Sequence, residues 1–228
     1  MRPQTRLRVP RPWTVLGALA FVYTTTAGAP LAAGSDSQGA PQPKARASIS
    51  TTRKRLDVLV GHRVRVAGKL APALPGQEVA LDLRRSGRWQ EVAHTRTTAT
   101  GGYRLSYTPR RSGSTLIELR SPGDAHTGPT RRVLGRVNSY RVVQASFYGP
   151  GMYGGGLACG GRLEQGRLGV ANKTLPCGSR VTLRYHGRRL RVPVIDRGPY
   201  VGGREYDLTE ATKRALGFPS TGSLWATR

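Results

Sequence analysis

The chain has 228 residues, enough for two small domains or one large domain. It carries 37 Lys and Arg against 12 Asp and Glu, and the net charge of +25 predicts an anionic neighbour. Only this charge favours nucleic acid, so we expect no specific nucleic-acid partner. The four histidines are scattered singly and no Cys-x-x-Cys pair occurs, so we expect no metal and no cofactor.

Residues 1–33 have the order of a secretory signal peptide. Four arginines without an acidic residue come first, an apolar stretch runs from Trp13 to Tyr23, and small residues follow to Ala33. The apolar stretch is short for a membrane span, so we predict a secreted or cell-wall-associated protein. The alternative is an uncleaved signal segment, which would be its only contact with the membrane.

Residues 34–47 are small, polar and contain proline, which predicts a flexible linker. Residues 48–137 then show alternating apolar positions, for example at Val64 and Val66 and again at Tyr103 and Leu105. Turn residues separate these runs about every ten positions, a pattern typical of an antiparallel β-sandwich. The pattern "G…V.V.G…P..PG..V.L…W..V" resembles bacterial immunoglobulin-like modules, which usually space, bind or display.

Residues 140–228 differ from this pattern. The runs "RVTLRYHG" and "RRLRVPVID" predict two strands joined by a tight turn at His186 and Gly187. The segment "DLTEATKRALG" predicts a helix with Asp207 as its N-cap and Gly217 as its end. Several short strands and one helix in so few residues indicate a small closed barrel.

Both cysteines, Cys159 and Cys177, lie in this last segment. Their even number and the predicted export favour a disulfide between them, because the sequence offers no other thiol. The chain-entropy estimate for the loop they would close is a stabilisation of roughly 3 kcal/mol.

The combination "ASFYG…ACG…TLPCG…V.VIDRGPY….DLT" resembles the double-psi β-barrel of rare lipoprotein A, the septal-ring lytic transglycosylase family, from about Ala145 onward. The predicted fold is therefore all-β: an immunoglobulin-like β-sandwich followed by a six-stranded double-psi β-barrel with one short helix. The resemblance implies an extracytoplasmic protein that cleaves or binds peptidoglycan glycan strands. Anionic cell-wall polymers are the second predicted partner, and we expect a monomer.

The resemblance also implies a catalytic pair, a histidine and an aspartate. Asp196 stands in the "DRGP" turn, but Asn172 occupies the place of the histidine. One carboxyl can act as acid and then as base when the sugar's own hydroxyl is the nucleophile. Asn172 cannot transfer a proton, but it could orient a sugar hydroxyl or replace a hydrogen bond made by the histidine.

Two observations leave the role of Asp196 open. Arg197 beside it would stabilise the ionised carboxylate and oppose a general acid, unless the two side chains point apart. Asp196 could also be a turn residue whose oxygens accept backbone N–H bonds.

Further residues of the segment are predicted to contact the glycan: Tyr148, Tyr153, Glu164, Arg197 and Tyr200. The sequence therefore predicts a lytic transglycosylase-type enzyme. The alternative is a non-catalytic peptidoglycan-binding or expansin-like wall-loosening module, which the replacement of the histidine by Asn172 favours.

Overall fold

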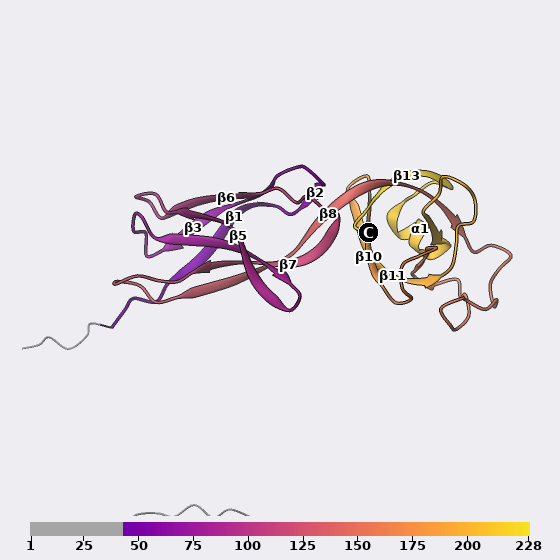
Figure 1. Cartoon of the computed structure of the whole chain (residues 1–228), viewed down its shortest axis with the longest axis horizontal. Coiled ribbons are helices and arrows are strands. Elements are labelled where there is room, and N and C mark those ends of the chain that lie inside the picture. Colours follow the sequence, from indigo (N-terminus) through magenta and orange to yellow (C-terminus); the bar gives the residue numbers. More distant parts are fainter. Residues whose placement is uncertain (1–42) are drawn as a thin grey trace, which may run out of the picture. The chain divides into compact units, whose positions relative to one another are not determined.

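The computed structural model describes residues 43–228, which contain thirteen β-strands and one short helix (Figure 1). The predicted signal peptide and residues 34–42 of the predicted linker lie outside the described residues. Among the residues described, no helix is long and apolar enough to cross a membrane.

Two sheets are built from the first half of the described chain. The three-stranded sheet has the order β1 (Ser48–Arg55), β3 (Val64–Ala71), β6 (Gly102–Tyr107). The second sheet continues through β5 (Arg88–Arg96), β4 (Glu78–Arg85), β7 (Gly113–Ser121) and the first part of β8 (Thr130–Tyr148). The short strand β2 (Asp57–Leu59) pairs in parallel with β8.

These two sheets share one hydrophobic core. The alternation predicted for β3 and β6 is confirmed, since Val64, Val66, Tyr103 and Leu105 are all buried. They belong to the same buried cluster as Ile117 of β7. Period-two patterning therefore places one face of each sheet in a common core. Whether this unit is immunoglobulin-like stays a prediction.

The junction between the two predicted domains is a continuous strand and not a loop. β8 runs for 19 residues and pairs with β7 in its first part and with β13 (Thr221–Ala226) in its second part (Figure 1). The buried cluster of the first half reaches Val137, and a separate cluster begins at Val143. Two buried clusters thus lie along one strand, and the division between residues 48–137 and 140–228 stays a prediction.

The predicted linker extends too far at its C-terminal end. Ala45 makes a bridge with Thr127, its amide donates to the His126 carbonyl at 2.8 Å, and its carbonyl accepts from Gly128 at 2.9 Å. Ala47 is buried in the first core. Residues 45–47 are therefore part of the folded unit, because their backbone groups find partners there.

Six strands close the barrel of the second half. They are the second part of β8 with β9 (Val170–Ala171), β10 (Arg180–Tyr185), β11 (Arg188–Asp196), β12 (Tyr206–Thr209) and β13. The order β12-β9-β11-β10-β13-β8 returns on itself because β8 also pairs with β12, in parallel. The barrel is filled by side chains such as Val181, Val194, Tyr206 and Leu208, all without exposed surface.

The predicted hairpin is confirmed: His186 and Gly187 have φ angles of 41° and 84° and join β10 to β11. Helix α1 (Glu210–Leu216) ends at Gly217, as predicted, and Gly217 has the positive φ of 65° that is typical of such an end.

The predicted N-cap of α1 was wrong. Thr209 is the N-cap, and its side chain accepts from the Thr212 amide at 3.2 Å. Asp207 lies inside β12 and pairs with Ala171 and Ser146, so the strand continues two residues beyond the predicted helix start. Non-local strand pairing overrides the local capping signal here.

Candidate active site

Asp196 ends β11, and one of its two carboxylate oxygens is fixed by the backbone. Oδ1 accepts hydrogen bonds from the amides of Ala158 and Arg197, each at 2.9 Å. The side chain is partly exposed, and no described residue donates a hydrogen bond to Oδ2. Asp196 therefore presents a carboxylate that is held through one oxygen and free at the other.

The guanidinium of Arg197 points away from Asp196. Nη1 donates to the carbonyls of Asn172 at 3.2 Å and Leu175 at 3.0 Å, and Nη2 donates to Sγ of Cys177 at 3.2 Å. In residues 43–228 no ion pair joins Arg197 to Asp196. The two adjacent side chains therefore bind different partners, and Arg197 holds the loop that contains Cys177.

Asn172 follows β9 and is only 7% exposed. Its Oδ1 accepts from the amides of Thr174 at 3.1 Å and Leu175 at 2.8 Å, and its Nδ2 donates to the Glu205 carbonyl at 3.0 Å. Its own amide donates to the carbonyl of Asp196 at 3.1 Å. The buried side chain therefore joins two backbone segments, the oxygen and the nitrogen of its amide group both bond to them, and the backbone of Asn172 adds a third contact to Asp196.

The disulfide between Cys159 and Cys177 is formed, with 5.5 Å between the two Cα atoms. It ties the loop of Ala158, which donates to Asp196, to the loop that Arg197 holds. One covalent bond thus links the two loops on either side of the carboxylate.

Tyr148 ends β8 with its ring packed in a small cluster that includes Leu157, Leu163 and Ile195. Its hydroxyl is buried and has no hydrogen-bond partner among the described residues. Burial raises the pKa of Tyr148 well above its usual range, and the negative charge of nearby Asp196 raises this pKa further. Tyr148 is thus a neutral phenol within the electrostatic field of Asp196.

The other predicted contact residues are not joined to Asp196 by any contact that the structure records. Tyr153 donates its hydroxyl to Oε2 of Glu210, and this bond raises the pKa of Tyr153. Glu164 is exposed, and its carboxylate has no described partner. Tyr200, which follows the cis bond between Gly198 and Pro199, is 81% exposed.

Three other carboxylates of the barrel have described partners, whereas that of Glu164 has none. Glu205 forms an ion pair of 2.5 Å with Nη2 of Arg141. Asp207 accepts from the Ser146 hydroxyl, and Glu210 accepts from Tyr153. Asp196 is the barrel carboxylate that accepts from two backbone amides through one oxygen while no described residue donates to its other oxygen.

The sequence could not predict the backbone donor of this site. Ala158 contributes only its N–H group, and no side chain marks such a donor in a sequence. The neighbouring Cys159 was the one available signal, because its disulfide carries the loop toward Asp196.

No group of three or more His, Cys, Asp or Glu side chains within the described part of the chain is arranged to hold a metal ion. The chemistry that this arrangement offers is proton transfer by a carboxyl group.

Residues 141–225 match the family model described as Lytic transglycolase. The probable endolytic peptidoglycan transglycosylase RlpA of Synechocystis sp. is 45% identical over 80 residues, which are 34% of this chain and 25% of that protein. The endolytic peptidoglycan transglycosylase RlpA of Pseudomonas aeruginosa is 36% identical over 99 residues, 42% of this chain and 29% of that protein. The endolytic peptidoglycan transglycosylase RlpA of Neisseria meningitidis is 38% identical over 81 residues, which are 35% of this chain and 34% of that protein.

The chain thus spans about a quarter to a third of the length of these curated relatives. Among solved structures, the Streptomyces papain inhibitor covers 40% of this chain and 96% of its own, at 24% identity and a TM-score of 0.32. That score is too low to establish a shared fold. The closed six-stranded barrel, the family match and the relatives agree on the same segment. Residues 141–225 of this chain therefore match the lytic transglycolase family model and resemble the double-psi β-barrel of the RlpA relatives.

Proposed function

We propose that this chain is an exported, peptidoglycan-active enzyme of the lytic transglycosylase type, which acts on cell-wall glycan strands with Asp196 as its acid and base. The observation that carries the proposal is the carboxylate of Asp196, with Oδ1 fixed by two backbone amides and Oδ2 free. It lies within the segment that matches the lytic transglycolase family.

The proposed reaction begins with transfer of a proton from Oδ2 of Asp196 to the glycosidic oxygen. The bond from this oxygen to the sugar C1 breaks and leaves an oxocarbenium-like centre. The 6-hydroxyl of the same sugar then attacks C1, and the carboxylate of Asp196 takes up its proton. The two N–H donors on Oδ1 stabilise the carboxylate between these steps.

The surrounding residues have supporting roles in this proposal. Asn172 and Arg197 fix the loops that frame Asp196, while the buried ring of Tyr148 packs in the small cluster that includes Ile195, next to Asp196 in the chain. Glu164 and the exposed ring of Tyr200 are proposed to contact the glycan. The chemistry needs no cofactor.

The substitution Asp196→Asn tests the assignment, because Asn keeps an oxygen that can accept from Ala158 and Arg197 but has no transferable proton. Purified peptidoglycan is incubated with each protein, and released fragments are separated and weighed by mass spectrometry. The wild type should release fragments and Asp196→Asn none, while both should sediment equally with the wall. The control Glu78→Gln makes the same chemical change at an exposed position of β4 and should leave release unchanged.

A second candidate is a non-catalytic wall-binding or wall-loosening module. The observation that favours it is Asn172, which stands where the resemblance implies a histidine and whose amide is committed to backbone partners. This candidate predicts that the wild type sediments with the wall but releases no fragment, and that Asn172→His releases none either.

We further propose that the chain acts outside the cytoplasmic membrane as a monomer, with an immunoglobulin-like sandwich before the barrel. The two sheets with one core support the sandwich, and the excess of basic residues supports contact with anionic wall polymers. A sedimentation-equilibrium mass of twice that of the purified chain would contradict the monomer.

A further inference from the structure

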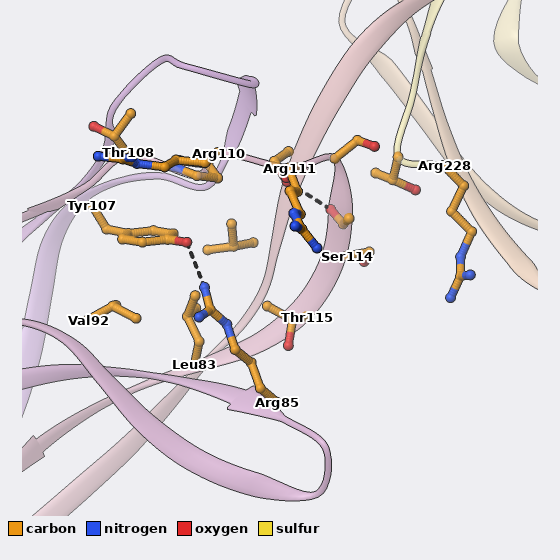
Figure 2. A pocket seen from close by; sticks show the side chains of 16 residues that line it. Leu83, Arg85, Val92, Tyr107, Thr108, Arg110, Arg111, Ser114, Thr115 and Arg228 are labelled. Atoms are coloured by element: carbon orange, nitrogen blue, oxygen red, sulfur yellow. Dashed lines mark hydrogen bonds between the residues drawn. The ribbon is translucent and has the colours of Figure 1, made fainter.

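A pocket of about 860 Å³ lies beside β4, the loop between β6 and β7, and the first part of β8 (Figure 2). None of its lining residues belongs to the candidate active site. A volume of this size is typical of sites for small ligands or short polymer segments.

The pocket is strongly basic. No aspartate or glutamate lines it, but four arginines do: Arg85, Arg110, Arg111 and Arg228. In the described part of the chain none of the four forms an ion pair, whereas Arg120, Arg141 and Arg189 each pair with a carboxylate elsewhere. Arginine keeps its charge at any physiological pH, so the pocket concentrates the positive charge of four guanidinium groups that no described aspartate or glutamate pairs with.

One of these guanidinium groups is already oriented. Nη2 of Arg85 donates to the Tyr107 hydroxyl at 2.8 Å, and Figure 2 shows the two groups turned toward one another. Tyr107 is a neutral partner that occupies one of the five N–H donors of Arg85. The remaining donors stay available for the oxygens of an anion.

The loop that carries Arg110 and Arg111 is held in place through its backbone carbonyls, which accept hydrogen bonds from other segments. The carbonyl of Pro109 accepts from the Gly61 amide at 3.0 Å, and the carbonyl of Arg111 accepts from the Ser139 hydroxyl at 2.8 Å. These bonds lie on either side of Arg110. A fixed loop lowers the conformational entropy that a ligand would otherwise have to remove from it.

The rest of the lining combines apolar side chains with hydroxyl groups. Val92 is partly exposed and supplies apolar surface, Leu83 and Val137 border the pocket from the buried core, and Ser112 and Thr108 supply hydroxyl groups. Such a lining suits a ligand with carbon-rich segments between anionic groups, such as a polyol or sugar chain. A single-stranded nucleic acid usually needs several aromatic side chains on which its bases stack, and Tyr107 is the one aromatic residue of this pocket.

We propose that this pocket is a binding site for an anionic polyol or sugar polymer, in which the arginines hold the phosphodiester or carboxylate groups. The choice of a wall polymer rests on the proposed location of the protein outside the membrane, whereas the anion specificity rests on the pocket alone. The site would anchor the chain on the anionic polymers of the wall, apart from any contact that the barrel makes with glycan.

The test measures binding of the full chain by titration calorimetry at fixed, moderate salt. The probes are a glycerol-phosphate oligomer, a uronic-acid oligomer, an uncharged polyglycerol and a single-stranded DNA of equal charge. The variant Arg110→Gln/Arg111→Gln removes two charges from the pocket. The control Arg53→Gln/Arg65→Gln removes two exposed charges from β1 and β3, where neither guanidinium has a described hydrogen-bond or ion-pair partner.

We expect an anionic polyol or sugar oligomer to bind and the uncharged one not to bind. The pocket variant should lose about tenfold or more in affinity, and the control variant less than threefold, since bonds from guanidinium to an oxyanion are stronger than diffuse attraction. The tighter of the phosphate and uronate probes identifies the anion.

Equal losses in the two double variants would overturn the proposal, because binding would then be diffuse attraction to a basic surface. Tighter binding of DNA, with the same dependence on Arg110 and Arg111, would assign the pocket to nucleic acid instead. Asp196→Asn should bind these probes like the wild type, so the outcome is independent of the proposed reaction. Unchanged melting temperatures would show that the variants are folded.

Discussion

The amide of Ala158 donates a hydrogen bond of 2.9 Å to Oδ1 of Asp196, 38 positions further along the chain. The disulfide of the next residue, Cys159, secures the loop that supplies this donor. The candidate acid is thus held by a backbone group on a loop whose position depends on a covalent cross-link.

The disulfide is therefore expected to support activity as well as stability. Replacing both cysteines, in Cys159→Ser/Cys177→Ser, should lower the free energy of unfolding by about 3 kcal/mol, as expected for a loop of this length. It should also lower the rate of fragment release at temperatures where the variant is fully folded, because the Ala158 donor is less well placed. Denaturant unfolding and the release assay measure the two effects. Full activity of the folded variant would show that the cross-link serves stability alone.

Asn172 should matter for stability even though it cannot transfer a proton. The substitution Asn172→Ala removes the acceptor of the Thr174 and Leu175 amides and the donor to the Glu205 carbonyl. We expect a loss of about 1–3 kcal/mol in the free energy of unfolding, because these groups lose their partner in a largely buried place. Chemical denaturation measures it. The matched control is Lys173→Ala, which truncates the exposed neighbouring side chain and should lower the free energy of unfolding far less. Equal losses in the two variants would contradict this account of Asn172.

Asp57 connects β2 to β8 and to Arg189 of β11. Its Oδ1 accepts from Asn138 Nδ2 at 2.8 Å and from the Tyr140 hydroxyl at 2.7 Å, and its Oδ2 accepts from Arg189 at 2.6 Å. Asp57→Ala should lower the free energy of unfolding by about 2–3 kcal/mol, since it leaves the buried Tyr140 hydroxyl without its partner.

The matched variant of this pair is Arg189→Ala. Its side chain is 50% exposed, so its loss should cost at most about 1 kcal/mol. Thermal and denaturant unfolding of both variants decide the question. A larger loss for Arg189→Ala than for Asp57→Ala would show that the ion pair, and not the hydrogen bonds to Tyr140 and Asn138, dominates this contact.

The lowered pKa of Asp124 should make the free energy of unfolding depend on pH in the acid range. The amides of His126 and then Thr127 donate to its carboxylate and lower its pKa to about 2, against an ordinary value of 3.8. Between these two values the unfolded chain binds more protons than the folded chain, so stability falls as the pH falls through this window. Asp124→Asn keeps an acceptor but does not titrate, and its unfolding curve should depend less steeply on pH there. An unchanged slope would rule out Asp124 as the source.

The sequence predicted the local features of the barrel better than its long-range contacts. The turn at His186 and Gly187 and the helix end at Gly217 follow from residue types that tolerate positive φ, and the structure has both. The helix start was misplaced because Asp207 is a good capping residue, while its pairing in β12 is made with distant segments. Secondary-structure signals within a few residues could not reveal that pairing.

The candidate site shows the same limit. Asp196 could be found from its motif, but the direction of Arg197 could not, because it is set by carbonyls of Asn172 and Leu175 on another segment. The amide of Ala158 has no sequence signature at all. The continuous strand β8 was missed because nothing in residues 130–148 indicates where one core ends and the next begins.

The central claim is that Asp196 catalyses an internal attack by the sugar's own hydroxyl, and the masses of the released glycan ends test it most directly. Purified peptidoglycan treated with the wild type should yield fragments with anhydro ends, each lighter by one water than a hydrolysis product, and Asp196→Asn should yield none. Fragments with ordinary reducing ends, or undiminished release of anhydro ends by Asp196→Asn, would contradict the account.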